Sequence, residues 1–148
     1  MTPFPHRYDV HLTGAAAGYA TLSSAGLPYL RVAAPAEFDG PGDAWTPEHL
    51  LLASVETCFL LTFRAIALRS SYAFTRLEVE ASGTVDRQDG VTRFTAITLR
   101  PTLVVAGNAD VERARQLLAR AEKNCLISAS LSTPVHLEPE IVVAEAVA

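Results

Sequence analysis

The chain has 148 residues, of which 49% are hydrophobic and 19% charged, a balance typical of a folded domain with a hydrophobic core. We therefore expect one domain over residues 1–148. The net charge of −4 argues against nucleic-acid binding, which needs a basic surface. Residues 1–7 contain two prolines and no apolar run, so we expect no signal peptide and a cytoplasmic location, where thiols stay reduced.

Three short β-strands are expected before residue 33. Residues 8–13 alternate as a strand does, and residues 19–23 and 29–32 are further strand candidates between glycine-containing turns. Residues 37–43 contain two glycines, one proline and three acids. This composition predicts a loop.

A long helix is predicted from Pro47 to about Ser70. Thr46 is suited to cap it, proline is tolerated at the first helical position, and Glu48 complements the positive end of the helix dipole. Apolar residues surround nearly its whole circumference, which is typical of a helix buried on all sides. A sheet is expected to cover one face and a second subunit the other. Five polar residues interrupt the apolar run over residues 50–68, so a buried helix is favoured over a membrane span.

A β-hairpin is expected next. Residues 76–86 alternate cleanly, Asp89-Gly90 is a hairpin-turn sequence, and residues 91–105 return as a long strand. A kink at Pro101 is one option for that strand.

A second helix is expected after the hairpin, capped by Asn108 or Asp110 and ending near Cys125. A short apolar segment over residues 126–131 and a final strand over residues 133–143 complete the chain. Strands, helix, hairpin, helix and strand in this order indicate an α+β domain rather than a wound βαβ sheet.

Cys58 and Cys125 are the residues that could carry chemistry. Core burial is the ordinary interpretation of both, since unpaired cysteines are among the most buried residue types. Cys58, however, lies in a polar interruption of the apolar helix, which a purely structural cysteine does not need. Cys125 comes at a helix end, where partial exposure is expected. The sequence leaves open whether the two sulfurs meet.

The segment from Thr46 to Phe59, TPEHLLLASVETCF, resembles the pattern of the OsmC/Ohr family of organic hydroperoxide reductases. In that pattern a Pro-Glu pair opens the central helix and a Cys-Phe pair follows. The ten-residue separation of Glu48 and Cys58 is the same, and the capped helix ending in Cys125 resembles the second family element. The resemblance implies an OsmC-like α+β fold, with antiparallel sheets packed around a long buried central helix, and an intertwined homodimer.

The resemblance also implies a reaction. The thiolate of Cys58 attacks an organic hydroperoxide and releases an alcohol, and the resulting sulfenic acid condenses with Cys125 to form a disulfide. A lipoyl-type or other small dithiol then reduces the disulfide. Because the thiolate is itself the nucleophile, no metal or cofactor is expected. Such a peroxidase acts in the response to oxidative stress and involves neither nucleic acid nor membrane.

Glu48 is implied as a third site residue. Ten residues of helix correspond to a rise of about 15 Å, so the side chains of Glu48 and Cys58 of one chain cannot touch. If Glu48 serves the site, we expect it to do so from the partner subunit. The alternative is that Glu48 is only a helix-start carboxylate.

One family element is not found, the arginine that pairs with the glutamate and lowers the pKa of the thiol. One alignment puts alanine near residue 16, and another puts Glu37, where the family has arginine. The chain therefore resembles a divergent branch. Glu56 would raise the pKa of Cys58 if it pointed the same way, but positions two apart on a helix diverge by about 200°. The basic residues that could substitute for the arginine are Arg7, Arg31, Arg64, Lys123 and His49.

Two other functions remain open: a non-catalytic OsmC-like dimer that binds a small ligand, and a redox-sensing dimer. Trp45, Phe38 and Tyr29 either pack in the fold or line an apolar pocket for the organic tail of a peroxide. The other histidines have no metal-ligand spacing with each other or with the cysteines. They are His6, His11 and His136.

Overall fold

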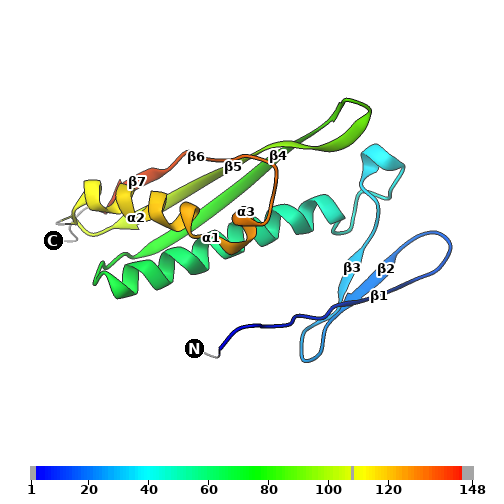
Figure 1. Cartoon of the computed structure of the whole chain (residues 1–148), viewed down its shortest axis with the longest axis horizontal. Helices are drawn as coiled ribbons and strands as arrows, with labels where there is room; N and C mark the ends of the chain where they lie inside the picture. The colour runs from blue at the N-terminus through cyan, green and yellow to red at the C-terminus, as the bar shows by residue number, and fades with distance from the viewer. Residues whose placement is uncertain (1–2, 108, 145–148) are drawn as a thin grey trace. The chain divides into compact units, whose positions relative to one another are not determined.

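The computed structural model describes residues 3–107 and 109–144, and Figure 1 shows the order of its elements along the chain. Strands, a long helix, a hairpin, two helices and two strands follow one another, which confirms the α+β class. The contacts cluster into two compact units, residues 1–51 and residues 52–148. A single domain over residues 1–148 stays a prediction.

The first unit contains a three-stranded antiparallel sheet. Its strands are β1 (His11–Gly14), β2 (Ala20–Ser23) and β3 (Leu30–Val32), in the order β1-β2-β3. They confirm the three predicted strands, although the first begins three residues later than expected. The predicted loop opens with a short 3₁₀ helix, η1 (Ala36–Phe38).

The long helix α1 spans Pro47–Arg69, as predicted. The Thr46 hydroxyl accepts a hydrogen bond from the amide of His49 at 3.3 Å, which is the expected cap. Within this chain only part of its circumference is covered, since Leu61 is 54% and Leu68 82% exposed. α1 is also long and apolar enough to span a membrane, but the core helices of soluble proteins meet the same two criteria. Its buried residues are Val55, Phe59, Phe63, Ile66 and Ala67.

The second unit is built around a β-hairpin of β4 (Arg76–Gln88) and β5 (Val91–Val105). Asp89 and Gly90 both have positive φ, 51° and 78°, which is the turn geometry that matches the strand twist. β5 runs through Pro101, which pairs with Val79. From Ile97 onward, every second residue of β5 is buried and faces the core: Ile97, Leu99, Pro101, Leu103 and Val105.

The prediction of a single strand over residues 133–143 is wrong in one respect, because this segment forms two strands. They are β6 (Val135–Leu137) and β7 (Glu140–Val143), and both pair parallel to β5. The break falls at Pro139, opposite Pro101 of β5, where neither proline has an N–H for the ladder. The sheet of this unit is therefore mixed rather than purely antiparallel.

Two helices lie between β5 and β6. α2 spans Val111–Lys123, and Asp110 caps it by accepting a hydrogen bond from the amide of Arg113 at 2.9 Å. The alternative cap, Asn108, lies outside the described residues. The predicted apolar segment is the one-turn helix α3 (Leu126–Ala129). The buried face of α2 consists of Ala114, Leu117, Leu118 and Ala121.

The cap of α2 gives a stability prediction. Asp110→Ala leaves the amide of Arg113 without its acceptor, and we expect the free energy of unfolding to fall by about 1 kcal/mol. Asp110→Asn keeps an acceptor and should lose much less. Urea unfolding followed by circular dichroism measures both, and equal losses in the two variants would contradict the capping role.

Candidate functional site

The fold brings the two cysteines together. Cys58 lies in the middle of α1, and Cys125 lies between α2 and α3 as the N-cap of α3. Their side chains hydrogen-bond to each other. The Cys125 sulfur also lies 4.0 Å from the carbonyl oxygen of Val55, one turn before Cys58 on α1. Both residues are free thiols, so the site is a reduced dithiol.

The two thiols differ in exposure. Cys58 is half-buried, whereas Cys125 is 1% exposed. The expectation that Cys125 would be partly exposed is therefore wrong. The reason is that α2 does not end in solvent: the chain turns directly into α3, and this junction lies against α1 at Val55.

The pKa of the Cys58 thiol is lowered from its ordinary value. Burial of the sulfur has the largest single effect and by itself raises the pKa, because it penalises the thiolate. Hydrogen bonds to the sulfur together outweigh that penalty. Every donor of these bonds is uncharged: the Cys125 thiol, the amide of Ile127, the Thr62 hydroxyl and the amide of Leu126.

The pKa of Cys125 moves in the opposite direction. Burial raises it most, and its contact with the Cys58 thiol raises it further, while the backbone of Ser128 partly opposes the change. Ionisation of Cys58 therefore favours the protonated form of Cys125, whose single hydrogen can then be donated to the thiolate instead of to the Val55 carbonyl, its acceptor in the structure. The dithiol is asymmetric, with Cys58 as the sulfur that ionises first.

Glu56 does not oppose this arrangement. Its carboxylate accepts a hydrogen bond from the backbone of Ala81 on β4, and burial raises its pKa more than this bond lowers it. The side chain is thus held at the sheet rather than at Cys58, as the angular separation of the two positions predicts.

Glu48 lies in the first turn of α1, in the first compact unit. One of its carboxylate oxygens, Oε2, is buried and has no hydrogen-bond partner among the described residues. A buried acceptor of this kind is costly unless another group satisfies it. The role of Glu48 in the site stays a prediction.

Two of the basic residues considered as substitutes for the arginine have other partners in the first unit. Arg31 forms an ion pair with Asp43 at 3.4 Å and lies 4.5 Å from the ring centre of Tyr19, whose hydroxyl donates to Asp43. That bond to Asp43 is the main reason why the pKa of Tyr19 is raised. His49 lies 3.1 Å from the Thr46 hydroxyl and meets the Trp45 ring edge to face.

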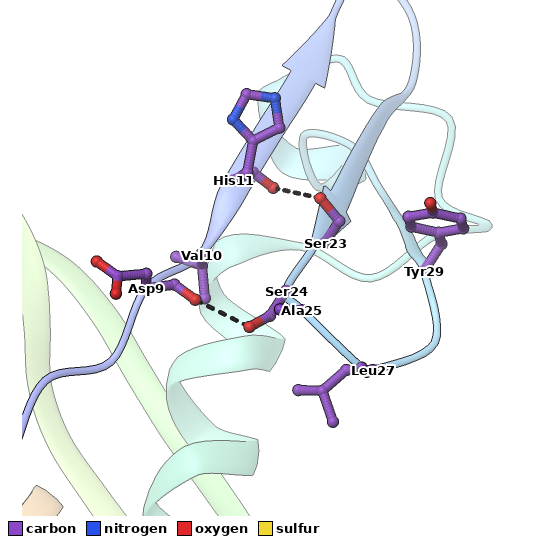
Figure 2. A pocket seen from close by; sticks show the side chains of 9 residues that line it. Asp9, Val10, His11, Ser23, Ser24, Ala25, Leu27 and Tyr29 are labelled. Atoms are coloured by element: carbon purple, nitrogen blue, oxygen red, sulfur yellow. Dashed lines mark hydrogen bonds between the residues drawn. The ribbon is translucent and has the colours of Figure 1, made fainter.

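Two open pockets lie in the first unit. The larger, of about 430 Å³, is shown in Figure 2 between the residues preceding β1 and the turn from β2 to β3, with Tyr29 on its wall. The smaller, of about 300 Å³, is lined by Trp45 and His49 together with Asp43. Tyr29 lines the larger of these two pockets and Trp45 the smaller, and a shared apolar pocket for the organic tail of a peroxide stays a prediction.

Comparison with known proteins places the chain in a family. Residues 40–140 match the family model described as OsmC-like protein. The chain belongs to the OsmC-like protein family. The matched range contains α1 and both cysteines, so the helix that opens with Pro47-Glu48 and the dithiol are parts of the family domain.

Individual members agree with this assignment. The uncharacterized protein YmaD of Bacillus subtilis is 34% identical over 112 residues, which cover 74% of this chain and 75% of that protein. An OsmC-like protein of unknown function from Vibrio cholerae superposes with a TM-score of 0.83 at 21% identity, covering 91% of this chain and 99% of that one. The organic hydroperoxide resistance protein OsmC of Legionella pneumophila gives a TM-score of 0.75 at 20% identity, covering 95% and 100%. These solved structures share the OsmC-like fold.

The structure adds site residues that sequence reasoning missed. In the sequence, Thr62 stands out only as one of several polar residues in an apolar helix, although its spacing of four from Cys58 places both on one helix face. The amides of Leu126 and Ile127 carry no side-chain signal at all. Their contribution comes from α3 beginning directly after Cys125.

The asymmetry of the dithiol gives a prediction that is independent of any enzymatic activity. Iodoacetamide reacts with thiolates, so Cys58 should be alkylated well before Cys125 at neutral pH. Peptide mapping by mass spectrometry of a time course measures both rates in the same sample. Equal rates, or faster labelling of Cys125, would contradict the assignment of Cys58 as the more acidic and more accessible thiol.

Proposed function

We propose that this OsmC-like protein is a thiol-dependent peroxidase that reduces organic hydroperoxides to alcohols. The observation that carries the proposal is the asymmetric dithiol: an accessible thiol of lowered pKa whose sulfur is hydrogen-bonded by a buried thiol of raised pKa. A two-cysteine peroxidase needs a nucleophile and a resolving thiol within reach of each other. The name of the Legionella neighbour supports the choice of organic hydroperoxides as substrate.

In the first step the Cys58 thiolate attacks the terminal oxygen of the hydroperoxide. The S–O bond forms as the O–O bond breaks, so the sulfur is oxidised to a sulfenic acid and the peroxide is reduced. The alkoxide that leaves takes up a proton and becomes the alcohol. The hydrogen-bond donors around Cys58 favour this step because they favour the thiolate.

In the second step Cys125 resolves the sulfenic acid. Its sulfur attacks the Cys58 sulfur, a disulfide forms, and the hydroxyl leaves as water with the proton of the Cys125 thiol. The contact between the two thiols supports this pairing, because a disulfide forms only between cysteines that the fold holds close together.

In the third step an external dithiol of the lipoyl type, or another small dithiol, restores both thiols. Thiol–disulfide exchange transfers two electrons to the protein and leaves the reductant as its own disulfide. We propose the cytoplasm as the site of action, since a reducing compartment maintains such a dithiol between turnovers.

We also propose that the active form is a homodimer. Leu61 and Leu68 are exposed apolar residues on α1, seven residues apart, which places them on one helix face. In the first unit Tyr8, Val10 and Leu12 are exposed at every second position. Exposed apolar rows of this kind are typical of surfaces that associate.

In this dimer we propose that Glu48 acts on the site of the other subunit. The buried Oε2 of Glu48 has no hydrogen-bond partner among the described residues, which supports a partner supplied by the second subunit. The rise of about 15 Å between Glu48 and Cys58 along one helix prevents direct contact within a chain. In a dimer, Glu48 of one subunit would reach Cys58 of the other, which agrees with both the unpartnered carboxylate and the helix geometry.

A redox-sensing or ligand-binding role is the second candidate, and one observation favours it. The groups that lower the pKa of Cys58 are all uncharged, whereas strongly activated cysteines often have a cation beside them. A steady-state assay separates the candidates, because a sensor or binding module reacts at most once, whereas a peroxidase turns over with a dithiol and an alkyl hydroperoxide.

The proposed roles predict different defects in two cysteine variants. Cys58→Ser should lose hydroperoxide reduction altogether, because a hydroxyl is not ionised at neutral pH. Cys125→Ser should consume about one equivalent of hydroperoxide per site and then stop with a sulfenic acid that dimedone labels. Peroxide consumption and mass spectrometry measure both. Full turnover by Cys58→Ser would contradict the assigned nucleophile.

Mixing variants tests the position of Glu48. Glu48→Gln and Cys58→Ser homodimers should each be nearly inactive, whereas a hybrid dimer contains one site with both native residues. Random exchange of subunits should then restore about a quarter of the wild-type rate in a two-fold symmetric dimer. Mixing Cys58→Ser with the double variant is the control and should restore nothing. No restoration in the first mixture would contradict a role across the dimer.

A further inference from the structure

Thr62 is placed to act on the sulfur of Cys58. It lies four residues later on α1, so both side chains leave the same helix face. The Thr62 hydroxyl oxygen is 4.0 Å from the Cys58 sulfur, and both residues are half-buried. The contact is therefore partly shielded from water, where a hydrogen bond to a charged group has more effect.

The direction of this hydrogen bond depends on the state of the sulfur. In the thiol either atom could be the donor. The thiolate has no hydrogen, so the Thr62 hydroxyl must then donate. A bond that becomes charge-assisted on ionisation is stronger in the thiolate than in the thiol, and it shifts the equilibrium toward the thiolate.

The β-branched shape of threonine makes this placement specific. The two heavy atoms on its Cβ restrict χ1 in a helix, where the hydroxyl prefers positions that reach the preceding turn. Cys58 is in that turn. Serine would keep the hydroxyl with more rotational freedom, and valine would keep the branched shape without the hydroxyl.

The other groups that face Cys58 in the second unit come from the α2–α3 junction. They are the Cys125 thiol and the amides of Leu126 and Ile127. Glu56, the acid on the preceding turn of α1, is held by Ala81 of β4. Thr62 is thus the side chain of α1 that forms a hydrogen bond with the Cys58 sulfur. The other groups at this sulfur belong to Cys125 and α3.

We propose that Thr62 is a positioning residue of the dithiol site, whose hydroxyl holds the Cys58 thiolate by a hydrogen bond. The inference deepens the proposed peroxidase, since it concerns the same nucleophile. It can be tested without peroxide, because the ionisation of Cys58 is measurable by itself.

The test is the pH dependence of Cys58 alkylation by iodoacetamide, followed by peptide mass spectrometry in wild type, Thr62→Val and Thr62→Ser. The rate rises with the thiolate fraction. In Thr62→Val the midpoint should move to higher pH, with a rate near neutrality about three- to tenfold lower. Thr62→Ser should recover most of the wild-type rate.

Thr57→Val is the matched control. Thr57 is an exposed threonine on the same helix, so the same chemical change there should leave the alkylation profile of Cys58 as in the wild type. An unchanged profile in Thr62→Val would overturn the proposal. So would a Thr62→Ser profile as shifted as that of Thr62→Val, because shape rather than the hydroxyl would then be responsible. Thr62→Ala, compared with Thr62→Ser, gives the same test if the valine variant does not fold.

The outcome is separable from that of the proposed function. A shifted Thr62→Val profile in a protein that does not turn over hydroperoxide supports the role of Thr62 and contradicts the peroxidase. Turnover by a wild-type protein whose profile does not change in Thr62→Val supports the peroxidase and overturns the role of Thr62.

Discussion

The buried face of β5 is the constraint on which the second unit depends. Five alternate residues of this strand point into the core, from Ile97 to Val105. The core also holds Phe59 and Phe63 from α1 and Leu118 from α2, all without exposed surface. Large buried side chains of this kind dominate the free energy of folding. Because α1 and α2 share this core, the end of α2 is brought to the turn of α1 that carries Cys58.

The chemical character of the site then follows from a difference in burial between two identical side chains. Cys58 keeps access to solvent and collects hydrogen-bond donors, whereas Cys125 is enclosed and is one of those donors. The environment assigns one sulfur to ionise and the other to keep its proton, and this division of roles is what a dithiol reaction needs.

Much of the fold could be predicted from the chain itself, because its signals are local. Thr46-Pro47 marks the start of α1, and Asp89-Gly90 marks the hairpin turn. The split between β6 and β7 was missed because it depends on Pro139 lying opposite Pro101, a register that no local pattern reveals. The burial of Cys125 and the amide donors of α3 were missed for the same reason, since both depend on tertiary contacts rather than on residue type.

The amides of Leu126 and Ile127 have a consequence for electron transfer. They bind the sulfur of Cys58 most strongly when it carries a negative charge. A disulfide carries none, so oxidation would weaken both bonds at the start of α3, and reduction would restore them. Stabilising the reduced dithiol makes its disulfide a stronger oxidant. In the proposed peroxidase, the donors that favour the thiolate for attack on the peroxide would therefore also favour reduction of the disulfide that follows.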